Sequence, residues 1–150
     1  MPQHCFPNKE CDTNNLSQIV FVKYGGSVIC ISGDVEKDGW EQLLAKEDFK
    51  TWLAATNVFV AAHHGRENGY AEEIFEFCFP ECIIFSDKRM VHGTQEGMVQ
   101  AYENHVKGNG VFLREPKNLD PRKVLTTRKD GHIWLRFNSS GTREYRTFAI

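Results

Sequence analysis

Three short apolar runs, each followed by a polar loop and then by a segment with helical spacing, constrain the fold of this chain most strongly. The runs are residues 27–31, 57–62 and 82–85. Strands that alternate with helices are typical of a layered sheet with helices packed against it. We therefore expect an α/β fold, an α+β arrangement in layers, with a mixed sheet and helices on one face.

The neighbouring segments fit this plan. Residues 18–23, a Gly25-Gly26 turn and residues 27–31 predict a hairpin. Residues 40–55 predict one long helix or two short ones, residues 71–78 a helix that Pro80 ends, and residues 98–106 a helix closed by Gly108. Residues 124–127, 132–137 and 142–148 predict a carboxyl-terminal antiparallel meander, with turns at 129–131 and 139–141.

Length and composition indicate one domain. A chain of 150 residues is close to the commonest domain size, and we expect residues 1–13 to be loosely ordered and residues 14–150 to form the domain. No apolar run approaches the roughly 20 residues that cross a bilayer, and the first residues lack a secretory signal. We expect a cytoplasmic protein without a membrane partner.

Cysteine usage is weakly informative. The count of five is odd, and Cys30 lies in an apolar run where a reduced, buried thiol is usual. A pairing of Cys5 with Cys11 and a zinc site at Cys78 and Cys82 are less favoured alternatives, because no second ligand pair follows.

Charge is unevenly distributed although the formal net charge is only −2. Acidic residues concentrate between Asp34 and Glu81, whereas the chain from Lys107 onward is basic. This asymmetry permits contact with a nucleic acid or another phosphate-containing substrate, but a solvated basic face is the commoner explanation. The basic residues are Lys107, Arg114, Lys117, Arg122, Lys123, Arg128, Lys129, Arg136, Arg143 and Arg146.

Side chains that can bind metal open the loops after the three apolar runs. They are Asp34, the pair His63 and His64, and His92. Loops that leave the carboxyl ends of parallel strands line one crevice, so we expect these side chains to converge there. Imidazole and carboxylate ligands suit zinc or manganese, and such ions support hydrolysis by lowering the pKa of a bound water.

Each of these residues also has a structural explanation. Gly33-Asp34 after a strand is common turn chemistry, and His92 alone is a weak signal. The adjacent imidazoles of His63 and His64 are harder to explain as packing, because both need polar partners. Ser86 as a nucleophile has no acidic partner or glycine elbow. His4, His105 and His132 are expected to be surface or packing residues.

Taken in order, five segments resemble the carboxyl-terminal half of metallo-β-lactamase-fold proteins, and most closely their DNA-uptake competence branch. They are NNLS at 14–17, GDVEK at 33–37, AAHHGRENG at 61–69, MVHGT around His92, and TTRKDGHIWLRF at 126–137. The resemblance implies half of an αββα sandwich, with Asp34 as the bridging aspartate and His92 as a late ligand. Of His63 and His64, it implies that one binds metal and the other contacts substrate or supports a ligand.

By this resemblance the catalytic residues are Asp34 and His64, and the metal is zinc or manganese, with up to two ions. Ser86, Arg66 and Lys88, in the same loops, are the expected substrate-binding residues. The competence branch is associated with nuclease action, so the expected reaction is hydrolysis of phosphodiester bonds.

One departure from the family is serious, because its His-x-His-x-Asp-His ligand loop occurs nowhere in the 150 residues. A catalytic zinc ordinarily needs three protein ligands. We expect a half-domain whose missing ligands come from an amino-terminal half, a partner chain or a second copy. The alternative is a binding or scaffold module that keeps the fold and has lost its metals.

Overall fold

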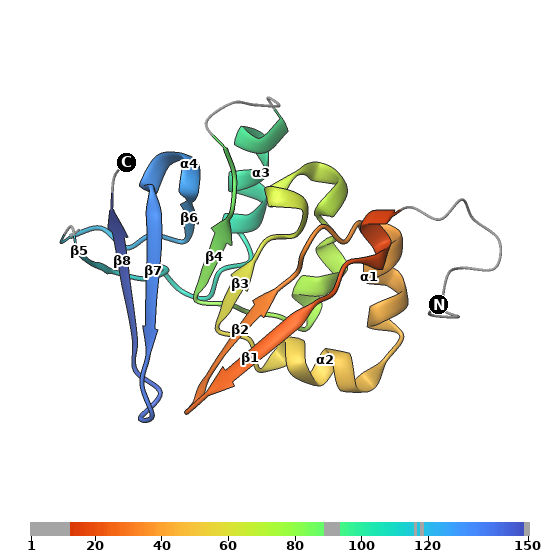
Figure 1. The fold of residues 1–150 in the computed structure, drawn as a ribbon, viewed down its shortest axis with the longest axis horizontal. Helices are drawn as coiled ribbons and strands as arrows, with labels where there is room; N and C mark the ends of the chain where they lie inside the picture. The colour runs from red at the N-terminus through yellow and green to blue at the C-terminus, as the bar shows by residue number, and fades with distance from the viewer. Residues whose placement is uncertain (1–12, 89–93, 116, 118, 149–150) are drawn as a thin grey trace.

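The apolar runs of the sequence become the strands of a five-stranded sheet in the computed structural model, which describes residues 13–88, 94–115, 117 and 119–148 (Figure 1). The sheet has the order β1-β2-β3-β4-β6. β1 and β2 form the predicted antiparallel hairpin, and every other neighbouring pair is parallel. The prediction of a mixed sheet is therefore confirmed. The strands are β1 (Val20–Tyr24), β2 (Ser27–Ile31), β3 (Val58–Val60), β4 (Cys82–Phe85) and β6 (Val124–Thr126).

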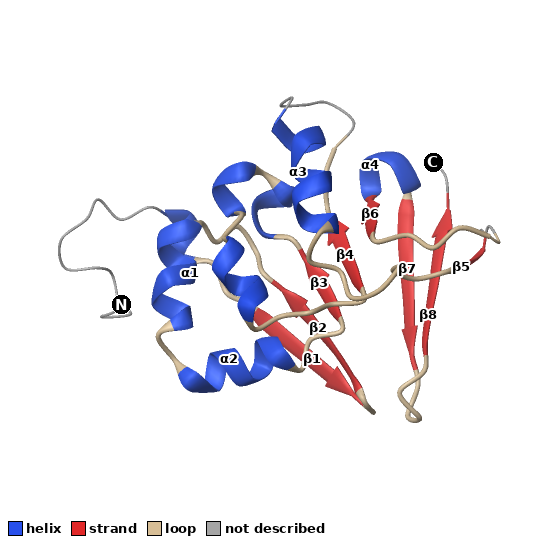
Figure 2. Ribbon diagram, turned by 180° about the vertical axis from the view of Figure 1, so that it is seen from behind, coloured by secondary structure: helices blue, strands red, loops and turns tan. Residues whose placement is uncertain are grey.

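Helices cover one face of this sheet, and a second, three-stranded sheet covers part of the other (Figure 2). On the helical side, Phe59 and Phe85 pack with Trp40 and Tyr102 in the larger core. On the other side, Val58 and Leu125 pack against Tyr145. The order of layers is thus helices, sheet, sheet, and the α/β class with helices on one face is confirmed.

The carboxyl-terminal meander is the largest correction. The second sheet has the order β5-β8-β7 and comprises β5 (Leu113–Glu115), β7 (His132–Phe137) and β8 (Arg143–Phe148). β7 and β8 form the expected hairpin, but β6 lies in the first sheet, parallel to β4. All three residues of β6 are buried although β6 is the last strand of the sheet, because Val124 packs in the core on the helical side and Leu125 in the core between the two sheets. The expected turn at 129–131 is the end of a short helix, α4 (Thr127–Asp130).

The helices match the sequence pattern in part. Residues 40–55 form two short helices, α1 (Lys37–Leu44) and α2 (Glu47–Ala54), separated at Lys46 by an extended backbone, so the two-helix alternative is confirmed. Residues 71–78 contain a 3₁₀ helix, Glu72–Glu76, in place of the predicted α-helix, and Pro80 follows it. α3 (Thr94–Glu103) ends before the predicted Gly108.

The first residues lie largely outside the described part of the chain. Thr13 begins a 3₁₀ helix, Thr13–Leu16, and residues 1–12 are not described. Cys5 and Cys11, whose pairing was considered, and His4 are therefore outside it as well. Among the helices of the described residues, none has the length and apolar character of a membrane span.

Trp40 ties α1 to the loop that carries the two histidines. Its side chain is fully buried, and its indole Nε1 donates to the carbonyl of Gly69 at 3.0 Å. A Trp40→Phe change leaves that carbonyl without its donor and leaves a gap, so we expect a loss of about 2 kcal/mol in the free energy of unfolding in urea. Trp52→Phe, at a half-exposed site, is the control and should cost under about 0.5 kcal/mol. Equal losses for the two variants would contradict the role of the buried indole.

Candidate functional site

The carboxyl ends of β2, β3, β4 and β6 lie along one edge of the first sheet, because these four strands are parallel. The loop after β2 carries Asp34, and the loop after β3 carries His63 and His64. Asp34 Oδ1 lies 3.6 Å from His64 Nε2. The structure therefore brings two of the sequence-predicted residues together from loops that are 30 residues apart in the chain.

A strained turn separates the environments of the two histidines. His63 and His64 have φ values of 47° and 59°, and they are the only described residues other than glycine with positive φ. This conformation costs a non-glycine residue roughly 1 to 2 kcal/mol. It directs the His63 side chain inward, where 13% of it is exposed, and that of His64 outward, where 48% is exposed. Strain of this kind concentrates at functional sites.

Gly65, the next residue, makes the turn feasible. Its φ is 77°, and a Cβ atom there would lie 2.4 Å from the ring of Phe85, far inside contact distance. The backbone of the histidine loop therefore lies directly on the buried end of β4. The His63 amide adds a second anchor, because it donates to the carbonyl of Gly33 at 2.9 Å.

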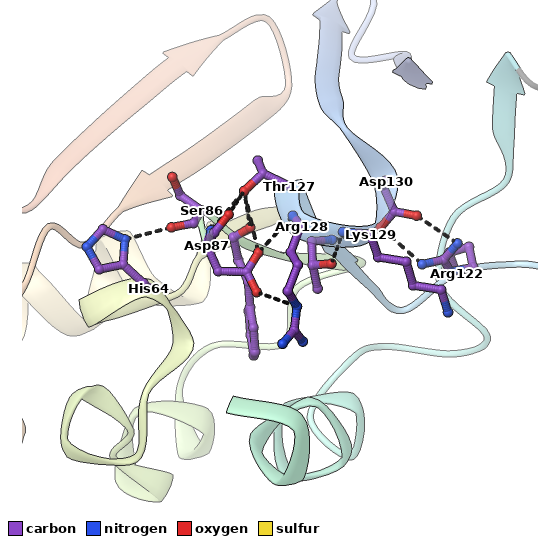
Figure 3. Close-up of polar contacts among 10 residues, drawn as sticks. His64, Ser86, Asp87, Arg122, Thr127, Arg128, Lys129 and Asp130 are labelled. Atoms are coloured by element: carbon purple, nitrogen blue, oxygen red, sulfur yellow. Dashed lines mark hydrogen bonds and ion pairs between the residues drawn. The ribbon is translucent and has the colours of Figure 1, made fainter. Parts of the chain in front are cut away.

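His64 has its proton position fixed by the backbone. Its Nδ1 lies 2.6 Å from the carbonyl oxygen of Ser86 (Figure 3). A carbonyl only accepts hydrogen bonds, so Nδ1 carries a proton and donates it. In the neutral ring Nε2 then holds the lone pair, and Nε2 is the atom that lies 3.6 Å from Asp34. Asp34 is positioned by its own amide, which donates to Ser17 Oγ at 3.1 Å.

His63 is held on both sides by the protein. Its Nε2 accepts from Arg66 Nη1 at 3.3 Å, and its Nδ1 lies 3.1 Å from Glu36 Oε1, although that contact is not aligned as a hydrogen bond. Glu36 Oε1 also accepts from the side-chain amides of Asn14 at 2.9 Å and Asn68 at 2.6 Å. To bind a metal, His63 would have to release Arg66 or Glu36, whereas His64 Nε2 already faces a carboxylate.

The remaining predicted residues have distinct positions. Ser86 contributes its backbone carbonyl to His64, and its side chain is exposed, as is that of Lys88. Arg66 is directed at His63 rather than outward. His92 lies outside the described residues, so its place at the site stays a prediction.

Asp87 was not anticipated from the sequence. Its side chain is fully buried, its Oδ1 accepts from the Arg128 amide at 3.0 Å, and its Oδ2 lies 3.3 Å from Arg128 Nε. Thr127 Oγ1 donates to the Asp87 carbonyl at 2.6 Å and accepts from the Asp87 amide at 2.8 Å (Figure 3). These contacts fix the end of β4 next to the Ser86 carbonyl. A polar Ser-Asp-Lys triplet after a strand suggests a loop, and nothing in it signals that the middle carboxylate is buried.

The three cysteines in the described part of the chain do not contribute to the site. Cys30, Cys78 and Cys82 are free and buried, and burial raises the pKa of the Cys30 thiol to about 12 and those of Cys78 and Cys82 further. Such thiols stay protonated at neutral pH, which makes them poor metal ligands and nucleophiles. The interpretation of Cys30 as a reduced, buried thiol is confirmed.

Much of the basic charge in the carboxyl-terminal part is paired. Five of its arginines lie within ion-pair distance of carboxylates, which favours the explanation of a structural, solvated face over a continuous phosphate-binding surface. The pairs are Arg114 with Glu144, Arg122 with Asp130, Arg128 with Asp87, Arg143 with Glu81, and Arg146 with Glu115.

Asp34, His64 and the carbonyl of Ser86 form the core of the candidate site. Across residues 13–88, 94–115, 117 and 119–148, no three His, Cys, Asp or Glu side chains lie close enough together to hold a metal ion. No family model, curated protein or solved structure matches the chain. What the site does is therefore inferred from its geometry.

Proposed function

We propose that this chain is a half-domain of a metal-dependent hydrolase that acts on phosphodiester bonds. Asp34 and His64 would hold a divalent ion, zinc or manganese, at the carboxyl edge of the first sheet. We further propose that the fold is the carboxyl-terminal half of a metallo-β-lactamase-like sandwich of the competence branch. The order of helices, mixed sheet and second sheet agrees with such a half.

The observation that carries the proposal is the separation of 3.6 Å between His64 Nε2 and Asp34 Oδ1. It is too long for a hydrogen bond. Two ligands bound tetrahedrally to one zinc ion at about 2.1 Å lie about 3.4 Å apart, so the pair fits a shared cation. In the neutral ring a lone pair faces a carboxylate, an arrangement that a cation between the two atoms would stabilise.

Several residues of this chain would have separate roles in metal and phosphate binding. The Ser86 carbonyl keeps the proton of His64 on Nδ1 and so presents Nε2 as a ligand. Ser17 holds Asp34 through its amide and leaves the carboxylate to bind. When bound, the ion would supply a water of lowered pKa and would neutralise negative charge on the phosphate. Exposed Lys88 and Lys129, after β4 and within α4, lie at the same edge and can bind phosphate oxygens.

Two ligands do not complete a catalytic zinc site, which ordinarily has three from the protein. His92 is the third candidate in this chain. The remaining ligands, in this proposal, come from a partner chain or from an amino-terminal half, since the His-x-His-x-Asp-His loop is absent from these residues. The competing proposal is a scaffold that binds no metal.

Metal titration tests the proposal. We expect the wild-type chain to bind about one Mn²⁺ or Zn²⁺ ion, measured by calorimetry and by elemental analysis after gel filtration. His64→Gln should weaken binding by at least about tenfold, because it removes the Nε2 ligand. His132→Gln, at an exposed position of β7, is the control and should bind as the wild type does.

Two results would count against the metal site. Equal affinity of His64→Gln and the wild type would remove His64 from it. A wild-type chain with no stoichiometric metal would favour the scaffold.

A further inference from the structure

The second sheet covers only part of one face of the first sheet. A solvent-exposed apolar strip lies on the remaining part of that face. The strip consists of Val20, Val22 and Tyr24 of β1 and Ile31 of β2, which are 44%, 46%, 55% and 41% exposed. Four large apolar side chains gathered on two neighbouring strands are typical of a contact surface.

Strand pairing assigns the strip to that face. Val20 pairs with Ile31, and Ile31 pairs with Val60, so their side chains point to the same side of the sheet. Val60 packs, partly buried, against the core between the two sheets. The strip therefore continues the surface that the second sheet already covers and begins where that cover ends.

Two strand edges beside the strip are open. β7 is the last strand of the second sheet and β1 the last of the first, and no strand within the described residues pairs with the outer side of either (Figure 1). An open edge presents unpaired backbone donors and acceptors to another chain. The strip thus lies between two sets of groups that can add a strand.

We propose that the apolar strip and the open edges of β1 and β7 form the interface of a two-fold symmetric dimer of this chain. The β1–β2 hairpin of each copy covers the strip of the other. The first sheet of one copy then continues the layer of the other copy's second sheet, which places β1 beside the partner's β7.

The exposed strip and the two open strand edges can complement the same surface on a second copy of the chain. A two-fold interface requires that one surface carry both halves of the contact, and here each chain offers one bare strip, one β1 edge and one β7 edge. α1, α2 and α3 lie on the far face of the first sheet, so in the dimer they stay outside, and two sheets pack face to face between them. Pairing of β1 with β1 alone would leave both strips bare.

Sedimentation of the full chain tests the dimer. We expect the wild-type mass to rise from monomer to dimer between about 1 µM and about 1 mM. Val22→Lys should raise the Kd at least about tenfold, because it would bury an unpaired charge. The control is Leu119→Lys, at a residue that is 81% exposed outside the strip, and it should leave the Kd unchanged. A wild-type chain that stays monomeric throughout, or equal effects of the two lysines, would overturn the proposal.

Hydrogen exchange on the wild type needs no variant. Amides of both β1 (Val20–Tyr24) and β7 (His132–Phe137) should gain protection as concentration rises. Protection of β1 alone would indicate edge pairing of two β1 strands and would contradict this interface, as would protection of neither strand. The dimer does not rest on the proposed hydrolysis, because it can form whether or not Asp34 and His64 bind metal.

Discussion

Gly65→Ala is expected to lower the free energy of unfolding by about 3 kcal/mol. Roughly 1 to 2 kcal/mol come from placing alanine at a φ of 77°, and a similar amount comes from forcing the new methyl group against the ring of Phe85, 2.4 Å away. Urea unfolding followed by circular dichroism measures the loss. The change acts on the turn that carries His63 and His64, so metal affinity should fall together with stability.

Gly97→Ala is the matched control for this change. Gly97 lies in α3, and among the described residues no atom outside the backbone of that helix lies within 4 Å of the position a Cβ atom would take there. Alanine favours a helix over glycine, so this variant should be about 0.5 to 1 kcal/mol more stable than the wild type. A Gly65→Ala protein as stable as the wild type would show that the histidine loop does not lie against β4 as described.

Asp34→Ala is expected to abolish stoichiometric metal binding and to reduce phosphodiester turnover by about 100-fold or more, if the proposed function is right. This variant keeps His64 as the remaining ligand of the pair. A single imidazole does not retain an ion at the metal concentrations used in an assay. Hydrolysis of bis-(p-nitrophenyl) phosphate with added Mn²⁺ measures the rate.

The control is Glu41→Ala on α1, which removes an exposed carboxylate that is not among the proposed ligands and should leave turnover unchanged. If Asp34→Ala turns over substrate at the wild-type rate, Asp34 has no part in the reaction. Stability of both variants should stay within about 0.5 kcal/mol of the wild type, since neither side chain is buried.

Local patterns in the sequence were sufficient for the hairpin and for the strands of the first sheet up to β4. Gly25-Gly26 between two apolar runs gave the β1–β2 turn, and the buried run at Cys82–Phe85 became a central strand. The approach of Asp34 to His64 followed from a general rule, because parallel strands bring their carboxyl ends to one edge.

The features that the sequence does not predict depend on tertiary contacts. The three residues of β6 have no periodicity that could say which sheet they join, and only burial on both faces places them beside β4. The division between His63 and His64 depends on two positive φ values in succession, which no side-chain pattern encodes. The roles of Asp87 and Glu36 can be recognised only from their contacts in the fold, with Arg128 and His63 respectively.

Holding His64 by a main-chain oxygen has a consequence for how the site can vary. Every amino acid supplies a carbonyl, so no replacement of the Ser86 side chain removes the acceptor that sets the imidazole tautomer. An alanine scan through position 86 would therefore overlook its contribution to His64. The position of that carbonyl is instead sensitive to changes at Asp87 and Thr127, whose hydrogen bonds fix the path of the chain after Ser86.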